Sequence, residues 1–416
     1  MDTLALKNAL ETAREGLAAL QAVSWKHRLE ALERWAQVWS SRPNPEAIAE
    51  IADAAQMSPQ MVAWAARTTC EAFIQDAQVL LTEATGDPNR LDGSAGGVAV
   101  LSPPVWGHVW ASTLPTSGWM PVLTGLLCGS AAVIKAPQRA LPAALWLART
   151  LQDADPCFAK SVQVSVWRGG GPEDAILVQG SDALVVSAGA QAVERFAHLC
   201  ADQPGPLPAV FFGPGRSLAV VLDGQSHSPD LFDALALDVA AYDQLGCLSP
   251  QAIWLQNADE ATGRAFCQAL AQALDRLGAT LPRGPLPNDA AAAIMQRKAT
   301  APFTGGRIFE ATDATVLWEP TAMRADCPLH RTIAVHAFKG DHHNLEATIS
   351  QHERRLHAVA IAGTTSFRAQ FGLMFAARFG ASRICQPGTM QTPPGRWHHD
   401  GMAWLAHLLK FTDFEA

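Results

Sequence analysis

Short apolar segments typical of buried strands alternate along this chain with segments rich in Ala and Leu that are typical of helices. This alternation constrains the fold more than any other feature, because buried parallel strands are connected by helices that cover the sheet. We therefore predict an α/β fold built on a doubly wound parallel sheet. The predicted strands are 131–135, 162–167, 183–187, 218–222 and 252–255, and the predicted helices between them are 140–152, 190–200 and 261–277.

The pattern extends in both directions. Apolar residues recur at spacings of three and four over residues 3–39, and a second helical stretch covers 58–81. A buried strand is predicted at 96–101. Three later strands (314–318, 332–335 and 358–362) predict a second α/β unit. Because 416 residues correspond to two or three domains of about 150 residues, we place a boundary near 225 and predict domains 1–225 and 226–416.

Composition and charge exclude several classes of protein. Hydrophobic residues make up 49% of the chain and charged residues 17%, which argues against disorder. The formal net charge of −8 gives no overall positive field for a nucleic acid. The first sixteen residues include five charged ones, and no apolar run approaches the ~20 residues needed to span a bilayer. We expect a soluble cytoplasmic protein with no membrane span.

The metal-binding residue types do not have the spacing of a metal site. The eight cysteines include no Cys-x-x-Cys pair, so neither a zinc knuckle nor a disulfide framework is predicted. Two clusters, Asp341-His342-His343 and His398-His399-Asp400, contain adjacent histidines. Neighbouring side chains diverge by ~100° on a helix and point to opposite faces of a strand. We therefore predict no metal site.

One cysteine has the setting of a nucleophile. Cys247 follows a glycine on a loop after a helix and before the strand at 252–255, where backbone amides could stabilise a thiolate. The alternative, a thiol packed in a turn, stays open from the local pattern. Ser187-Ala-Gly189 ends a strand and precedes a helix, which favours anion binding. The three glycines 169–171 are more typical of an ordinary turn, since no G-x-G-x-x-G is present.

Two long motifs carry a resemblance to a known family. They are Gln244-Leu-Gly-Cys247-Leu-Ser-Pro250 and Gln386-Pro-Gly-Thr-Met-Gln391-Thr-Pro-Pro394, with Trp397-His-His-Asp400-Gly401 after the second. Together they resemble the luminescence-type acyl-CoA reductases of the aldehyde dehydrogenase superfamily, over about Gly96 to Gly401. The resemblance implies a Rossmann-type cofactor domain, an α/β catalytic domain and a nicotinamide cofactor. It also implies that Cys247, in the cleft between the domains, is the nucleophile.

The resemblance assigns cofactor ligands position by position. Val133-Ile-Lys135-Ala-Pro137 looks like the superfamily strand whose lysine reaches the adenosine ribose. Relatives that prefer NAD carry a glutamate three residues later, where this chain has Gln138 followed by Arg139. Without that carboxylate a 2′-phosphate meets no repulsion, and Arg139 can pair with it. The predicted cofactor is NADPH, although Arg139 as a merely solvated residue is the alternative. Ser187 and Gly189 are the predicted phosphate contacts.

Three departures from the superfamily pattern bear on the chemistry. Phe211 stands where hydrolytic aldehyde dehydrogenases carry the glutamate that activates water. His108 occupies the place of an asparagine that donates to the oxyanion, and we predict that it takes over this hydrogen bond. The segment Cys327-Pro-Leu-His-Arg331 lacks the glutamate that holds the nicotinamide ribose in relatives.

The resemblance and these departures predict the reduction of an acyl thioester to an aldehyde with NADPH, through an acyl-enzyme on Cys247. The acyl donor would be acyl-CoA or an acyl carrier protein. A homo-oligomer or an aldehyde-consuming enzyme is a further predicted partner. Two alternatives remain: an aldehyde dehydrogenase working in the oxidative direction, and a catalytically silent cofactor-binding subunit of a biosynthetic complex.

Overall fold

The chain folds into two compact units. The computed structural model describes residues 3–224, 227–320, 327–350 and 355–415. The first unit contains residues 1–55, 62–214 and 394–416, and the second contains 56–61 and 215–393. The chain passes into the second unit at Gly215 and returns to the first at Pro394. The C-terminal segment is therefore part of the first unit.

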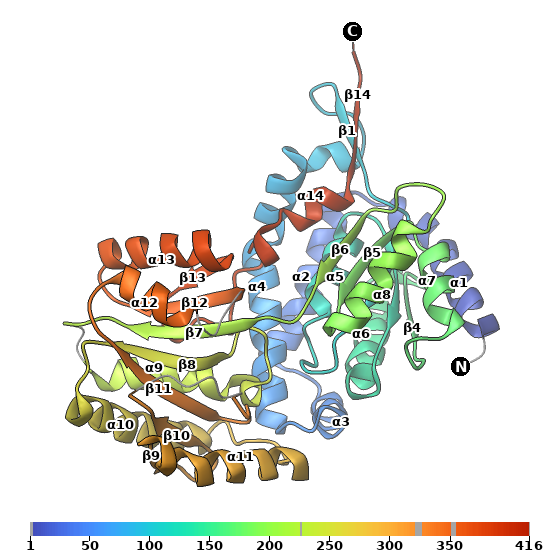
Figure 1. The fold of residues 1–416 in the computed structure, drawn as a ribbon. Helices are drawn as coiled ribbons and strands as arrows, with labels where there is room; N and C mark the ends of the chain where they lie inside the picture. Colours follow the sequence, from blue (N-terminus) through green and yellow to red (C-terminus); the bar gives the residue numbers. More distant parts are fainter. Residues whose placement is uncertain (1–2, 225–226, 321–326, 351–354, 416) are drawn as a thin grey trace. The chain divides into compact units, whose positions relative to one another are not determined.

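The first unit is built on a five-stranded parallel sheet with the order β4-β3-β2-β5-β6. Figure 1 labels β4, β5 and β6 of this sheet. Its strands are β2 (Val105–Val109), β3 (Ala131–Lys135), β4 (Val162–Ser165), β5 (Ala183–Ser187) and β6 (Ala209–Phe212). Its helices are α1 (Thr3–Gln21), α2 (Trp25–Ser41), α3 (Pro45–Ala55), most of α4 (Pro59–Thr85), α5 (Trp119–Leu127), α6 (Leu141–Ala154), α7 (Pro172–Gly180), α8 (Ala190–Ala201) and α14 (Trp404–Leu408). The sheet order reverses direction between β2 and β5, which is the doubly wound arrangement predicted above.

Side chains that alternate along the strands form the core of this unit on both faces of its sheet. Val105, Val109 and Val133 pack with α1, α7 and α8 in one cluster. Because successive side chains of a strand point to opposite faces, Trp106 and His108 face the other side. There, tryptophans of α2 and α5 pack together, with the Trp39 and Trp119 rings 4.9 Å apart.

The strand predicted at 96–101 requires a correction. β1 covers Val98–Leu101 and pairs antiparallel with β14 (Lys410–Asp413) in a two-stranded sheet of its own. Only the middle of β1 is buried, and Leu101 is 53% exposed. The first strand of the five-stranded sheet is instead β2, which the apolar pattern did not reveal because Gly107 and His108 interrupt it.

The second unit contains a seven-stranded sheet with the order β13-β12-β7-β8-β11-β10-β9, parallel except for β9. Its strands are β7 (Arg216–Val221), β8 (Pro250–Gln256), β9 (Arg307–Glu310), β10 (Thr315–Trp318), β11 (Thr332–Phe338), β12 (Leu356–Ala362) and β13 (Arg383–Cys385). Its helices are α9 (Pro229–Ala240), α10 (Glu260–Gly278), α11 (Asn288–Thr300), α12 (His342–Ile349) and α13 (Thr365–Phe379).

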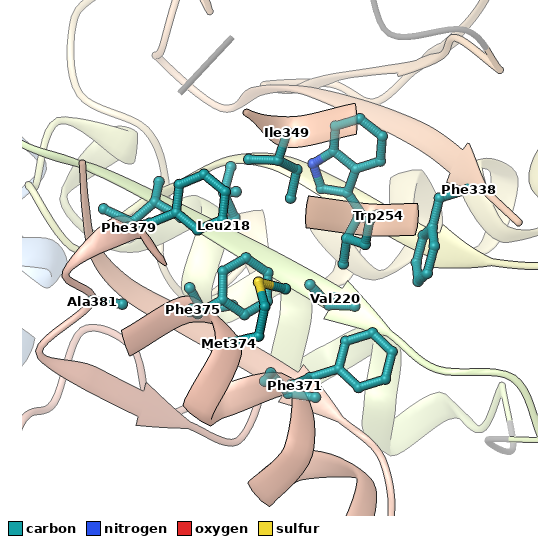
Figure 2. Close-up of a cluster of buried hydrophobic side chains, with 14 of the residues drawn as sticks. Leu218, Val220, Trp254, Phe338, Ile349, Phe371, Met374, Phe375, Phe379 and Ala381 are labelled. Carbon is teal, nitrogen blue, oxygen red and sulfur yellow. The ribbon is translucent and has the colours of Figure 1, made fainter. Parts of the chain in front are cut away.

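Aromatic side chains of α13 form the core over one face of this sheet. Figure 2 shows Phe371, Phe375 and Phe379 grouped with Leu218 and Val220 of β7. Each such side chain contributes roughly 1.5–3 kcal/mol when fully buried. This packing fixes the position of β7 and β12 in the sheet, and both strands lead to the site described below.

Among the residues that the structure describes, no helix combines the length and the apolar character needed to cross a membrane.

Candidate active site

Cys247 lies on the loop between α9 and β8, and the chain enters this loop through a strained turn. In the single turn η4 (Ala241–Gln244), Tyr242, Asp243 and Gln244 have φ values of 54°, 52° and 64°. Left-handed backbone costs a residue other than glycine about 1–2 kcal/mol, and it persists only where the surroundings hold it. The conformation of the loop is therefore imposed by specific contacts.

The start of β11 supplies two of those contacts, and Gly284 and Pro250 supply the others. Arg331 is buried and places a guanidinium nitrogen 2.7 Å from Asp243 Oδ1, while Gly284 N donates to Asp243 Oδ2 at 3.0 Å. Gln244 is also buried: its Nε2 donates to the Pro250 carbonyl at 2.9 Å, and its Oε1 accepts from Thr332 N at 2.8 Å. The segment that begins at Cys327 lacks the glutamate found in superfamily relatives. It thus holds the loop that carries Cys247.

The turn around Cys247 is closed by hydrogen bonds on both sides. Ser249 N donates to the Gly246 carbonyl at 3.0 Å, and Ser217 Oγ donates to the Cys247 carbonyl at 2.8 Å. Cys247 itself is partly exposed. The backbone of this partly exposed residue is therefore held in place by hydrogen bonds.

The other seven cysteines are poor candidates for a thiolate. Burial raises the pKa of Cys128 and Cys157 to about 12 and that of Cys200 and Cys327 to about 11. It also raises the thiol pKa of the remaining three, which are Cys70, Cys267 and Cys385. Because the thiolate is the nucleophilic form, burial disfavours nucleophilic attack by these seven cysteines.

The second long motif is physically connected to the first. Gln391 Nε2 donates to Ser249 Oγ at 2.9 Å, two residues beyond Cys247. The buried carboxylate of Asp238, on α9, accepts hydrogen bonds from Gly388 N at 2.6 Å and Met390 N at 2.9 Å. The segment around Gln391 therefore braces the loop that carries the nucleophile, which accounts for the presence of both motifs in one chain.

Sequence reasoning missed a histidine beside the cysteine. His357, on β12, is buried and has a ring nitrogen within 4.8 Å of Cys247 Sγ. The predicted strand began at Ala358, so the histidine was not considered. A polar residue at the start of an otherwise apolar strand was the available signal.

The first unit offers a site for an anionic ligand at the carboxyl ends of its strands. Lys135 ends β3 and pairs with Val109, while Ser187 ends β5, so the two residues flank β2 at the same edge of the sheet. This edge lies at the point where the strand order reverses, where α/β sheets bind ligands. Gly189 caps α8, no side chain caps that helix, and a Cβ at Gly189 would meet open space. The amino end of α8 is therefore accessible to an anion.

The predicted cofactor ligands differ in burial. Lys135 is partly buried, with Nζ 5.5 Å from the centre of the Trp167 ring, and burial lowers its pKa while Asp174 opposes this shift. Gln138 and Arg139 are exposed in the short η2 turn (Gln138–Ala140), directly after β3. Their assignments as cofactor ligands stay predictions.

His108 is buried in the middle of β2, and neither ring nitrogen has a hydrogen-bond partner among the described residues. Burial lowers the pKa of His108 to about 3. The ring is therefore neutral at physiological pH and carries one N–H donor. Its role as an oxyanion donor stays a prediction.

In the cluster Asp341-His342-His343 the side chains lie close together, whereas neighbouring side chains were predicted to diverge. Potential ligand atoms of Asp341, His342 and His343 lie within 4.8 Å of one another, and the two imidazole rings are 4.1 Å apart. The Asp341 side chain caps α12 by accepting from His343 N and Asn344 N, which draws the first turn together. The carboxylate therefore has a structural function in this cluster.

Comparison with known proteins places the chain in a family. The model of the acyl-CoA reductase (LuxC) family matches residues 20–411, nearly the whole chain. The chain belongs to this family. The family predicted from the Cys247 and Gln391 motifs is thereby confirmed.

One curated relative of this acyl-CoA reductase family member is distant in sequence. A protein of Vibrio harveyi named long-chain acyl-protein thioester reductase is 24% identical over 323 residues, which cover 74% of this chain and 63% of that protein. The matched region thus spans less than two thirds of the relative.

Solved structures identify the fold. The chain is similar to an aldehyde dehydrogenase from Brucella melitensis biovar abortus 2308, with a TM-score of 0.75 and 13% identity over 100% of this chain and 91% of the other. It is also similar to an NADP-dependent glyceraldehyde-3-phosphate dehydrogenase from Bacillus halodurans C-125 complexed with NADP, with a TM-score of 0.73 and 14% identity over 100% and 92%. The predicted aldehyde dehydrogenase-like α/β fold is confirmed.

Proposed function

We propose that this chain reduces an acyl thioester to an aldehyde with NADPH through an acyl-enzyme on Cys247. The observation that carries the proposal is the loop in which Cys247 is partly exposed while Ser217, Gln244 and Gln391 hold its surroundings. Family membership supports acyl reductase chemistry. The name of the Vibrio harveyi relative supports a thioester substrate.

In the proposed reaction the Cys247 thiolate attacks the thioester carbonyl. The carbon–sulfur bond to the carrier breaks, and the carrier sulfur takes up the proton that Cys247 lost, so the carrier leaves as a thiol. When bound, the reduced nicotinamide supplies the hydride that converts the acyl group to an aldehyde. Cys247 then leaves the product carbon as a thiolate, takes up one proton from solvent and is ready for the next acyl group.

The residues of the first unit fit a dinucleotide. Lys135 and Arg139 provide positive charge at the carboxyl edge of the sheet, and the open amino end of α8 at Gly189 suits a phosphate. The NADP complex of the Bacillus halodurans neighbour supports a phosphorylated nicotinamide cofactor for this fold. We propose that Lys135, Gln138 and Arg139 contact the adenosine ribose and its 2′-phosphate, and that Ser187 and Gly189 contact the diphosphate.

The acyl donor is proposed to be acyl-CoA or an acyl carrier protein. Phe211 favours reduction over oxidation to a free acid, because its phenyl ring cannot activate water. A homo-oligomer or an aldehyde-consuming partner enzyme stays a prediction.

Intact-protein mass spectrometry tests the proposal. We expect the wild-type protein, incubated with a panel of acyl-CoAs without cofactor, to retain an acyl mass that Cys247→Ala does not retain. Cys200→Ala is the matched control, because Cys200 is also partly exposed. Acylation of Cys247→Ala to the wild-type level would overturn the assignment. Acylation of wild type followed by no aldehyde with NADPH would support the silent subunit instead.

A further inference from the structure

His357 and Cys247 meet at one edge of the large sheet in the second unit. β7, β8 and β12 run parallel, and the register pairs Ser217 with Pro250 and Leu356 with Arg216. The amino ends of the three strands therefore lie level with one another. Cys247 is on the loop that leads into β8, and His357 is the second residue of β12.

The pairing of β7 with β8 and β12 is irregular at the amino ends of these strands, and this changes the direction of the side chains there. The register of β12 against β7 shifts between Leu356 and Val359, and that of β7 against β8 shifts between Ser217 and Ala219. Such irregularities in sheets redirect side chains and occur often beside active sites. His357 and Ser217 both lie at these shifts.

A serine hydroxyl joins the backbone of the two residues. Ser217 Oγ donates to the Cys247 carbonyl at 2.8 Å and accepts from Ala358 N at 3.2 Å. Ser217 is fully buried. Because one atom binds both backbone segments, the spacing between the cysteine and the histidine is set by the fold.

The chain also makes room for the imidazole ring. A Cβ added at Gly215 would lie 2.1 Å from Cδ2 of His357, well inside van der Waals contact. Gly215 has no left-handed φ, so space for the ring, rather than backbone conformation, accounts for this glycine. Any larger residue would displace His357 from its position near Cys247 Sγ.

We propose that His357 is the proton-transfer partner of Cys247, an inference that rests on the acylation chemistry proposed above. The neutral imidazole takes the Sγ proton, which gives the thiolate that attacks the acyl carbon. The imidazolium gives this proton to the carrier sulfur as its bond to carbon breaks, so the carrier leaves as a neutral thiol. After hydride transfer Cys247 leaves as a thiolate and recovers a proton from solvent through His357. One proton is consumed per turnover, as reduction of a thioester by NADPH to an aldehyde and a thiol requires.

Several other ionisable groups on the elements around β12 are paired elsewhere or lie on neighbouring strands. Arg383 donates to the carbonyls of Thr389 and Met390, Arg368 donates to the Gly363 carbonyl, and Arg378 pairs with Glu346. Arg216 begins β7, and Cys385 ends β13. Asp238 lies near Arg383. Among these groups we assign the exchange of a proton with Cys247 to His357, because a ring nitrogen of His357 lies within 4.8 Å of Cys247 Sγ.

The test compares the wild-type full chain with His357→Gln, which keeps similar bulk and cannot carry the proton. Iodoacetamide alkylation of Cys247 is followed by mass spectrometry from about pH 6 to 10, a range that spans the ordinary thiol pKa of about 8.5. We expect the variant's midpoint to move up towards about 8.5. We expect single-turnover acylation by octanoyl-CoA near pH 7 to fall about 100-fold, within the usual range for general base catalysis.

His336→Gln is the matched control, because His336 is a buried histidine on β11 of the same sheet. It should leave the pH profile of alkylation unchanged. Identical profiles and acylation rates for wild type and His357→Gln would overturn the inference. If octanoyl-CoA and other acyl-CoAs acylate neither protein while the alkylation profile still shifts, the pairing stands and the proposed function fails.

Gly215→Ala provides a second variant that leaves the histidine in the chain. It should slow acylation and shift the alkylation profile in the same direction as His357→Gln. When Gly215→Ala is combined with His357→Gln, it should cause little further change in acylation rate or alkylation profile, because the imidazole ring that it displaces is already absent. If His357→Gln does not fold, an unchanged profile in Gly215→Ala overturns the inference.

Discussion

Asp238 is a buried carboxylate that organises the segment around Gln391, and its ionisation is coupled to folding. Burial raises the pKa of Asp238 to about 7, although the amides of Gly388 and Met390 and the charge of Arg383 act in the opposite direction. In the unfolded chain the pKa of an aspartate is about 3.9. The folded state therefore holds an extra proton between about pH 4 and 7. The contribution of this group to stability is complete below that window and is lost as the pH rises through about 7.

Asp238→Asn should remove this pH dependence. The stability of wild type relative to the variant should fall from about pH 5 to 8, when the free energy of unfolding is measured with urea across that range. Asp233→Asn, an exposed carboxylate on the same helix, is the matched control. A flat difference between wild type and Asp238→Asn would contradict the prediction.

Substitution of the exposed residue Arg139 tests the predicted preference for NADPH over NADH. Arg139→Ala should weaken NADPH binding by roughly 1.5–3 kcal/mol, the usual contribution of a hydrogen bond to a charged group, and should leave NADH binding almost unchanged. Fluorescence titration with each cofactor measures both affinities. Arg149→Ala, another exposed arginine of the same unit, is the control. Equal affinity of wild type for the two cofactors would count against the 2′-phosphate contact.

At the scale of elements, α10 packs on β10 through a glycine. A Cβ added at Gly263 would lie 2.2 Å from the ring of Trp318, whose side chain is fully buried and whose Nε1 donates to Glu260. The ring has no room to retreat, because protein interiors are close-packed. The glycine therefore sets how near the helix lies to the sheet.

Gly263→Ala should destabilise the protein by about 1–3 kcal/mol, the usual cost of overpacking a core. Gly278→Ala, in the last position of the same helix, should be neutral or slightly stabilising, because its Cβ meets nothing and alanine favours helix. Urea unfolding of both variants measures the difference. Equal stability of the two would show that α10 shifts freely on β10.

At the scale of the whole molecule, the fate of the acyl-enzyme decides the direction of the reaction. Because Phe211 replaces the residue that would activate water in the superfamily pattern, the acylated protein should hydrolyse slowly in buffer. NADPH should discharge it quickly as aldehyde, and CoA should return acyl-CoA. Decay of isolated acyl-enzyme in buffer, with CoA and with NADPH, measures the three rates.

Free acid released in buffer as fast as aldehyde forms with NADPH would favour the oxidative or hydrolytic alternative. Phe211→Glu is a second check, because a carboxylate at this position should accelerate hydrolysis if the alignment with the superfamily is correct. In the structure Phe211 contributes to the apolar core of the first unit. Thermal unfolding of the variant should therefore accompany the rate measurement.

The local pattern of apolar residues was sufficient to predict much of the fold. Buried strands such as Ala131–Lys135 and Ala183–Ser187 are continuous apolar runs, and helices such as Ala190–Ala201 follow them, so periodicity alone located them. The strands that were not predicted are short or interrupted, as in β2, β6, β9, β13 and β14. Their identity as strands depends on pairing with neighbours rather than on their own composition.

The sequence by itself determined the fold class, the family and the loop that carries Cys247, because these depend on contiguous patterns of residues. Only the tertiary structure decided what surrounds the sulfur. Arg331 reaches Asp243 across 88 positions of sequence, and Met390 reaches Asp238 across 152. His357 comes near Cys247 because β7, β8 and β12 align their amino ends in one sheet. Strand order and register are set by packing between distant segments, which no local periodicity encodes.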